Sequence, residues 1–121
     1  MATLALLVDG VVVQRFTVDR TDITIGRLSN NDIHIEDGAV SSRHARIVPK
    51  ANRYLPSQID YHIEDLQSTN GTFVNGSRID TQQLGNNDEL RIAWNHFRFI
   101  DDEQPDFERT AVILEPQLNP A

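Results

Sequence analysis

The chain has 121 residues, no cysteine and a formal net charge of −7 at pH 7. This length suits a single domain with its own hydrophobic core, and the lack of cysteine excludes a disulfide framework and a thiolate metal site. No segment is long and apolar enough to span a membrane, and the apolar N-terminus lacks the basic leader of a signal peptide, so we expect a cytoplasmic protein.

The negative charge is concentrated in the last part of the chain. Residues 101–121 hold six acidic residues and one arginine, a net charge of −5, which leaves 10 bases and 12 acids, or −2, for residues 1–100. The whole chain contains one lysine. Because binding to a phosphate backbone needs clustered lysine and arginine, a nucleic acid is not an expected partner.

Signals for short β-strands recur along the chain. Asp9-Gly10 separates two strand-like stretches, Thr3 to Val8 and Val11 to Val18, and predicts an N-terminal hairpin. Further on, apolar residues alternate with polar ones, and each set is expected to face a core: Ile23 and Ile25, Ile33 and Ile35, Ala45 and Ile47, then Leu90, Ile92 and Trp94, and finally Phe97 and Phe99. No window shows a helical period. The sequence therefore predicts an all-β domain built from two packed antiparallel sheets.

Two stretches interrupt this pattern. Residues 49–60 contain two prolines and are expected to form a surface loop or a wide hairpin. Residues 101–121 are acidic and contain three prolines, so we interpret them as a C-terminal tail that is weakly ordered or docked on a domain of residues 1–100.

The stretch Ser68 to Gly76 contains two strong turn signals. Asn70-Gly71 and Asn75-Gly76 flank a short apolar run, and asparagine and glycine both tolerate positive φ. We therefore expect two tight reversals with a short strand, Thr72 to Val74, between them. Most such turns only reverse the chain, but hydroxyl, amide and backbone N–H groups in one loop also suit a peptide or an anion.

Hairpin geometry predicts that this loop lies beside another polar segment. If the strand after Ser41 to His44 returns as an antiparallel partner through Tyr61 to Leu66, the loop after Leu66 reaches the end where the first strand began. Five extended residues could also bring Ser41 back beside Arg27. One end of the domain would then present arginine, serine, threonine and asparagine side chains, which have the chemistry of a phosphate and peptide site.

The ordered set of motifs resembles the forkhead-associated (FHA) domain family. It consists of Gly26-Arg27, Asn31-Asp32-Ile33, Ser41-x-x-His44-Ala45, Ser68-Thr69-Asn70-Gly71-Thr72 and Val74-Asn75-Gly76. The resemblance covers roughly residues 4–100. It implies an antiparallel β-sandwich of about eleven short strands, and a non-catalytic module that binds phosphothreonine peptides in Ser/Thr kinase signalling, without a cofactor.

The resemblance also implies a role for individual residues. Arg27 and Ser41 match positions that contact the phosphate, Thr69 matches the residue beside the phosphothreonine, and Asn70 matches the asparagine that pairs with the peptide backbone. Further matched positions are structural: Gly26, Gly71 and Asn75 shape loops or turns, and His44 braces the binding loops from behind.

Ser42 departs from the family pattern, in which arginine or asparagine is common at this position. Serine is shorter and uncharged, so the site is expected to hold phosphate with one cation fewer. Alternation along the segment points the neighbouring Arg43 away, so it is not expected to substitute. The main alternative is therefore a domain of the same fold that docks a partner without phosphate.

Other readings of these residues are weaker. The four histidines show no short metal-ligand spacing and no acidic companions, which argues against a metal site. Nothing resembling a nucleophile elbow surrounds Ser41, Ser42 and His44, which argues against an enzyme.

In the tail, Thr110 followed by Ile113 is a candidate phospho-acceptor and ligand for the domain itself, because the family commonly reads the residue three places after the phosphothreonine. The other reading is that the apolar patch Ala111 to Leu114 only docks on the sandwich.

Overall fold

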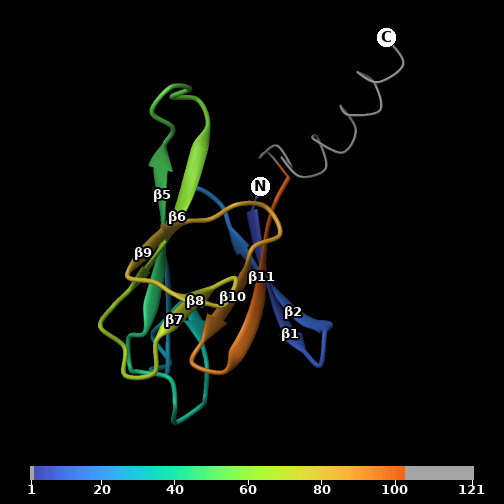
Figure 1. Cartoon of the computed structure of the whole chain (residues 1–121), viewed down its shortest axis with the longest axis vertical. Helices are drawn as coiled ribbons and strands as arrows, with labels where there is room; N and C mark the ends of the chain where they lie inside the picture. The colour runs from blue at the N-terminus through green and yellow to red at the C-terminus, as the bar shows by residue number, and fades with distance from the viewer. Residues whose placement is uncertain (1, 103–121) are drawn as a thin grey trace.

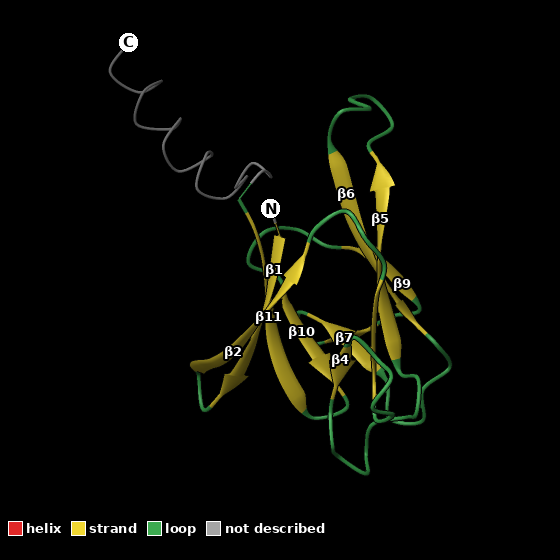
Figure 2. Ribbon diagram, turned by 180° about the vertical axis from the view of Figure 1, so that it is seen from behind, coloured by secondary structure: helices red, strands yellow, loops and turns green. Residues whose placement is uncertain are grey.

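The computed structural model describes residues 2–102, which form a two-layered β-sandwich (Figures 1 and 2). There is no helix among these residues. The strands are β1 (Ala2–Val8), β2 (Val11–Val18), β3 (Ile23–Gly26), β4 (Ile33–His34), β5 (Ala45–Ala51), β6 (Ile59–Asp65), β7 (Thr72–Val74), β8 (Ser77–Arg78), β9 (Thr81–Gln83), β10 (Glu89–Ile92) and β11 (Asn95–Asp101). The prediction of an all-β sandwich is confirmed.

The strands form a six-stranded sheet, in the order β2-β1-β11-β10-β7-β8, and a five-stranded sheet, in the order β4-β3-β5-β6-β9. One pairing differs from the expected antiparallel arrangement, because β4 runs parallel to β3. The loop of residues 27–32 is long enough to bring the chain back parallel to β3, because β4 has only two residues and pairs only with the end of β3. Asp32 fixes it, since its Oδ2 accepts hydrogen bonds from the Thr24 backbone N–H at 2.9 Å and the Thr24 hydroxyl at 3.1 Å.

The core lies between the two sheets and includes most of the predicted alternating positions, together with residues such as Leu4 and Ile63 that were not among them. Leu4, Phe97 and Phe99 of the first sheet are completely buried, as are Ile25 and Ile47 of the second. Burying side chains of this size contributes roughly 1.5–3 kcal/mol each. The alternation of apolar residues therefore predicted the inward faces of these strands.

Trp94 is the exception, because the expectation that it faces the core with Leu90 and Ile92 is wrong. Strand β10 ends at Ile92, and Ala93 adopts a left-handed backbone with φ of 54°. This reversal turns Trp94 outward, where 62% of its surface is exposed. Side chains alternate between the two faces only while the chain stays extended. Here the extended conformation ends at Ile92, before it reaches Trp94.

Two of the predicted turns, at Asp9-Gly10 and Asn75-Gly76, are present, but Asn70-Gly71 is not a tight two-residue turn, because only Gly71 has a positive φ and the pair lies in the longer connection between β6 and β7. Asp9 and Gly10 have φ of 52° and 78°, and Asn75 and Gly76 have φ of 50° and 86°, as a two-residue turn between twisted strands requires. Residues 49–60 form a wide hairpin, in which β5 and β6 remain paired out to Ala51 and Ile59.

Candidate functional site

Three loops meet at one end of the sandwich: residues 27–32 after β3, 35–44 before β5, and 66–71 after β6. The Arg27 backbone N–H donates to the Ser41 carbonyl oxygen at 3.0 Å, and the Leu66 N–H donates to the His44 carbonyl oxygen at 2.9 Å. These bonds place segments far apart in sequence side by side: hairpin geometry predicted the second contact, and the length of the connection allowed the first. Between them lies an open pocket of about 340 Å³, lined by Arg27, Gly38, Ala39, Val40, Ser41, Ser42, Thr69 and Asn70.

The five residues predicted to contact a phosphopeptide, Arg27, Ser41, Ser42, Thr69 and Asn70, all line this pocket. Arg27 is held in place by two hydrogen bonds, from Nε to the Val40 carbonyl oxygen at 3.1 Å and from Nη2 to the Ser42 hydroxyl at 3.2 Å. A guanidinium has five N–H donors, so others remain for a ligand. By contrast, Arg43, which follows Ser42 in the sequence, donates from Nη1 to Asn31 Oδ1 at 3.4 Å and does not line the pocket, as expected.

The two serine hydroxyls are arranged as donors toward the pocket. Ser41 Oγ accepts the Thr69 backbone N–H at 3.1 Å, and Ser42 Oγ accepts from Arg27. A hydroxyl that accepts a bond from the protein still has its own O–H to donate. Both serines can therefore offer a proton to an anion.

Asn70 connects two of the loops at the floor of the site. Its Nδ2 donates to the Ala39 carbonyl oxygen at 2.7 Å, across 31 positions of sequence. This bond uses one N–H of the Asn70 amide, so its Oδ1 acceptor and its second N–H remain available to pair with a peptide backbone.

The loop that carries Thr69 and Asn70 is shaped by Asp65. Its Oδ1 accepts the hydroxyls of Ser68 at 2.6 Å and Thr72 at 2.7 Å, and its Oδ2 accepts the Ser68 N–H at 3.1 Å. Ser68 Oγ in turn accepts the Gly71 N–H at 3.0 Å. Ser68 and Thr72 therefore fold the loop, whereas Thr69 lines the pocket.

His44 lies completely buried behind the pocket. Its Nδ1 accepts the Ser41 backbone N–H at 3.1 Å, and its Nε2 lies 2.8 Å from the Gly71 carbonyl oxygen. A neutral ring with its proton on Nε2 satisfies both contacts. Since both ring nitrogens are bound to the backbone, neither faces a serine hydroxyl, and the arrangement is not that of a nucleophile and its base.

Two glycines are required by this geometry. A Cβ on Gly26 would lie 2.3 Å from the Ser42 carbonyl oxygen, so only glycine lets the two loops approach so closely. Gly71 has φ of 87°, and a Cβ there would come within 2.9 Å of the Phe73 ring. Asn31 stabilises the close approach of Gly26 to Ser42, because its Nδ2 donates to the carbonyl oxygens of Leu28 and Ser42, both at 2.9 Å.

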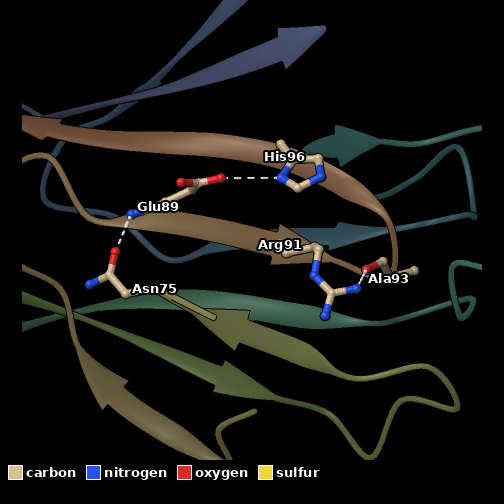
Figure 3. A network of polar contacts seen from close by, with 5 residues as sticks. All are labelled: Asn75, Glu89, Arg91, Ala93 and His96. Carbon is tan, nitrogen blue, oxygen red and sulfur yellow. Dashed lines mark hydrogen bonds and ion pairs between the residues drawn. The ribbon is translucent and has the colours of Figure 1, made fainter. Parts of the chain in front are cut away.

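Asn75 lies apart from the pocket, in the turn between β7 and β8. Its Oδ1 accepts the Glu89 backbone N–H at 2.9 Å, as Figure 3 shows, and its own N–H donates to the Glu89 carbonyl oxygen at 2.8 Å. These two bonds fasten the turn to β10.

Sequence reasoning missed the contribution of the segment 37–40. Asp37 Oδ1 accepts the Ala39 N–H at 3.0 Å, and its Oδ2 accepts from Asn95 Nδ2 at 3.1 Å. The Ala39 N–H, and then Asn95, lower the pKa of Asp37. The Asp37-Gly38 pair is a turn signal that could have revealed this wall of the pocket.

Within residues 2–102, no three histidine, cysteine or acidic side chains gather closely enough to hold a metal ion. No helix of the described part is long and apolar enough to cross a membrane.

Known proteins resemble this chain in sequence. It is 35% identical over 86 residues to the glycogen accumulation regulator GarA of Mycobacterium tuberculosis, and 33% identical over 87 residues to the oxoglutarate dehydrogenase inhibitor of Corynebacterium diphtheriae. These matches cover 71% and 72% of this chain, but 48% and 56% of the relatives. The chain thus spans about half the length of the curated relatives it matches.

Solved structures share its fold. The FHA domain of FhaA, determined in complex with the intracellular domain of Rv3910, superposes with a TM-score of 0.68 at 27% identity, over 82% of this chain and 99% of that one. EmbR of M. tuberculosis, in complex with a low-affinity phosphopeptide, gives 0.68 at 32% identity, over 82% of this chain and 24% of EmbR.

The family model for the FHA domain matches residues 23–93, which is more than half of the chain and includes all three pocket loops. The chain belongs to the FHA domain family.

Proposed function

We propose that this domain is a non-catalytic module that binds phosphothreonine-containing proteins or peptides in Ser/Thr kinase signalling. The observation that carries the proposal is the pocket in which Arg27, two serine hydroxyls, Thr69 and Asn70 converge. Family membership supports it, as do the phosphopeptide complex of EmbR and the complex of FhaA with Rv3910.

The chemistry of the pocket matches a phosphorylated side chain. A phosphothreonine carries roughly −1.5 to −2 charges and three acceptor oxygens. Arg27 supplies positive charge and N–H donors, Ser41 and Ser42 supply O–H donors, and Asn70 is available for the peptide backbone on either side. Each charge-assisted bond contributes about 1.5–3 kcal/mol, and three or four such bonds minus the cost of ordering a peptide give an affinity on the order of micromolar.

Arg27→Ala tests the site directly. We expect it to weaken binding of a phosphothreonine peptide at least about tenfold, because the variant loses the only cation that lines the pocket in the described part of the chain. Arg43→Ala is the matched control, since that arginine is nearby but directed at Asn31, and it should change affinity less than about threefold. Titration calorimetry measures both, and equal losses for the two variants would place the phosphate elsewhere.

The alternative, docking without phosphate, makes a different prediction for the ligand. We expect the unmodified threonine peptide to lose most of the affinity, because Arg27 and both hydroxyls would face no anion. A domain that binds both peptides equally would be a phosphate-independent docking module, in which Ser42 has reduced the need for the modification.

The chain's own tail is a second proposed ligand. Thr110, preceded by acidic residues and followed by Ile113, would enter the pocket of the same or a neighbouring molecule once a kinase has modified it; it lies outside the described residues. Mass spectrometry after kinase treatment, and then sizing of wild type and Thr110→Ala, test this. Such a role would place the protein with its kinase in the cytoplasm.

A further inference from the structure

We propose that the outer face of the six-stranded sheet binds the acidic stretch of the chain's own tail, residues 102–108. This contact needs neither a phosphate nor the pocket, so it goes beyond the proposed function. The inference starts from a cationic surface on a domain whose net charge is negative, and from an acidic segment that begins where a central strand of that surface ends.

The outer face consists of the strand positions that alternate with the buried ones. On β11, Phe97 and Phe99 are buried in the core, so Arg98 points outward. Strand register places Arg98 beside Ala5 of β1, and Ala5 beside Arg15 of β2. Ala5 is completely buried but is not part of the core cluster, as expected of a small residue that the stems of two arginines cover. The two exposed arginines therefore flank Ala5 on the outside of the sheet.

Two further arginines lie on this face. Arg91 of β10 stacks over the Phe73 ring, 3.7 Å from its centroid, and Arg78 of β8 is paired with Phe73. Among the outward strand positions the acidic residue is Glu89, whose Oε1 lies 3.3 Å from His96 Nδ1 (Figure 3). Four arginines and one glutamate give the face a net charge of +3, whereas residues 1–100 together carry −2.

The charges of Arg15 and Arg98 are not paired within residues 2–102. Carboxylates of this part of the chain lie within 4.0 Å of His34, Arg46 and His96, but not of either arginine. Both guanidinium groups therefore remain available to an acidic partner.

The tail carries the opposite charge and starts at the middle of this face. Residues 102–108 contain four acidic residues and no base: Asp102, Glu103, Asp106 and Glu108. They directly follow β11, which lies between β1 and β10 in the sheet. Residues 103–108 lie outside the described part of the chain. A tethered segment has an effective concentration on the order of millimolar, so even weak pairing of exposed charges is enough to hold it.

The distance along the strand suits a short reversal of the chain. Arg98 is three residue pairs from Asp101, which is about 10 Å along β11. Residues 102–105 include Pro105 and are sufficient for a turn. Residues 106–108 would then return over about the same 10 Å, which brings Asp106 and Glu108 to the row of Arg98 and Arg15.

The next features of the face and of the tail also match. Beyond the row of arginines, the half-buried Leu7 of β1 is paired with Val12 of β2, which is 39% exposed. Beyond residues 102–108, the tail becomes apolar at Ala111 to Leu114. A tail that runs back along the sheet therefore meets arginines with its acidic part and apolar side chains with its apolar part.

The test uses the full-length, unmodified protein. Because the chain has no cysteine, Ala111→Cys provides a single site for a nitroxide spin label. At low salt we expect the label to broaden the amide signals of Ala5, Leu7 and Arg98, and to leave those of residues 46–50, on the other sheet, unchanged. Salt at 1 M should remove the broadening, because the Debye length is then about 3 Å.

Arg15→Gln/Arg98→Gln should reduce the broadening at least about threefold. Lys50→Gln/Arg53→Gln is the control, because it changes the net charge equally but lies on β5 and the loop after it, and it should retain the broadening. Exchanging the charges, with Arg15→Glu/Arg98→Glu and Asp106→Arg/Glu108→Arg in one chain, should restore it. The amide spectrum of each variant also reports whether the variant has folded.

Three results would overturn the inference: no broadening on the outer face of wild type, equal losses in the two double glutamine variants, or no recovery after the charge exchange. Mixing a spin-labelled chain with an isotope-labelled chain that has no spin label should give no broadening; broadening there would assign the face to the tail of a second copy. Because no phosphopeptide is present, the proposed function can fail while this contact holds, and the reverse.

Discussion

The loops at the two ends of the sandwich are built in different ways. At the pocket end, side chains bond to backbone groups far away in sequence: Asn70 to Ala39 across 31 positions and His44 to Gly71 across 27. At the opposite end, the loop of residues 52–58 bonds mainly to itself. Asn52 Oδ1 accepts the N–H groups of Tyr54 and Leu55, and Tyr54 is 82% exposed.

This difference shows which loops have fixed positions relative to one another. Bonds within a single loop shape that loop but do not place it against another. Bonds between loops fix the distance between groups that must act on one ligand, as a binding site requires.

Gly26→Ala should cause the largest change. The new Cβ would lie 2.3 Å from the Ser42 carbonyl oxygen and must push two pocket loops apart. We expect a loss of about 3 kcal/mol in the free energy of unfolding and more than tenfold weaker phosphopeptide binding. Denaturant unfolding and calorimetry measure the two effects.

Gly85→Ala is the matched control, because a Cβ there meets only Asp88 side-chain atoms at 3.6 Å or more. It should change stability by less than about 1 kcal/mol and leave binding unchanged. Similar behaviour of the two variants would contradict the close approach at Gly26.

His44→Ala should come next. It leaves a cavity and removes both bonds that link Ser41 to Gly71, so we expect about 2–4 kcal/mol lower stability and at least fivefold weaker binding. Asn52→Ala removes bonds of the opposite loop and should cost about 1 kcal/mol or less, with affinity within twofold. Equal effects on binding would mean that the two ends are not distinct.

Replacing residues 52–58 by Asn-Gly should have no effect on binding. Ala51 and Ile59 are paired, so a two-residue turn can close the hairpin there. Stability should fall by about 1 kcal/mol or less, because the replacement removes the bonds of Asn52 and Gln58 to the buried Asp60, and the smaller entropy loss of a shorter loop offsets only part of that. Affinity measured by calorimetry decides, and a loss would show that this loop influences the pocket.

A small effect of pH on stability is expected from His62. Burial, and then Lys50, lower the pKa of His62, which lies in the middle of β6. The unfolded chain therefore takes up the proton first, so the stabilising contribution is present above pH 6.5 and is lost as pH falls through the lower folded value. Among the described residues the His62 Nδ1 has no partner, which adds to the cost of protonation. His62→Gln should reduce the fall in unfolding free energy between pH 7 and pH 5; an unchanged slope would assign that fall to other groups.

The sequence predicted the fold well where a local rule was sufficient. Asp9-Gly10 and Asn75-Gly76 form the expected turns, and the alternation at Ile25, Phe97 and Phe99 gave the buried faces. Strand pairing also predicted that the Ser41 segment and the loop after Leu66 lie at one end, whereas for Arg27 the sequence showed only that the connection is long enough to bring Ser41 beside it.

Other features could not be predicted, because they depend on contacts between distant segments. The outward direction of Trp94 follows from the left-handed backbone of Ala93, a residue with no turn propensity of its own. That conformation is accompanied by bonds to Arg91 and Gly71, which only the folded chain brings together. The parallel pairing of β3 with β4 likewise depends on the contact of Asp32 with Thr24.

The pairing of Ala2 with Asp101 also determines how the domain can be joined to other polypeptides. It brings the two ends of the described chain together, at the end of the sandwich opposite the pocket loops (Figure 1). A fusion partner or a surface tether attached at either point would emerge on the far side of the sandwich. Immobilising the domain through these points should therefore leave the pocket facing the solution and open to ligands of any size.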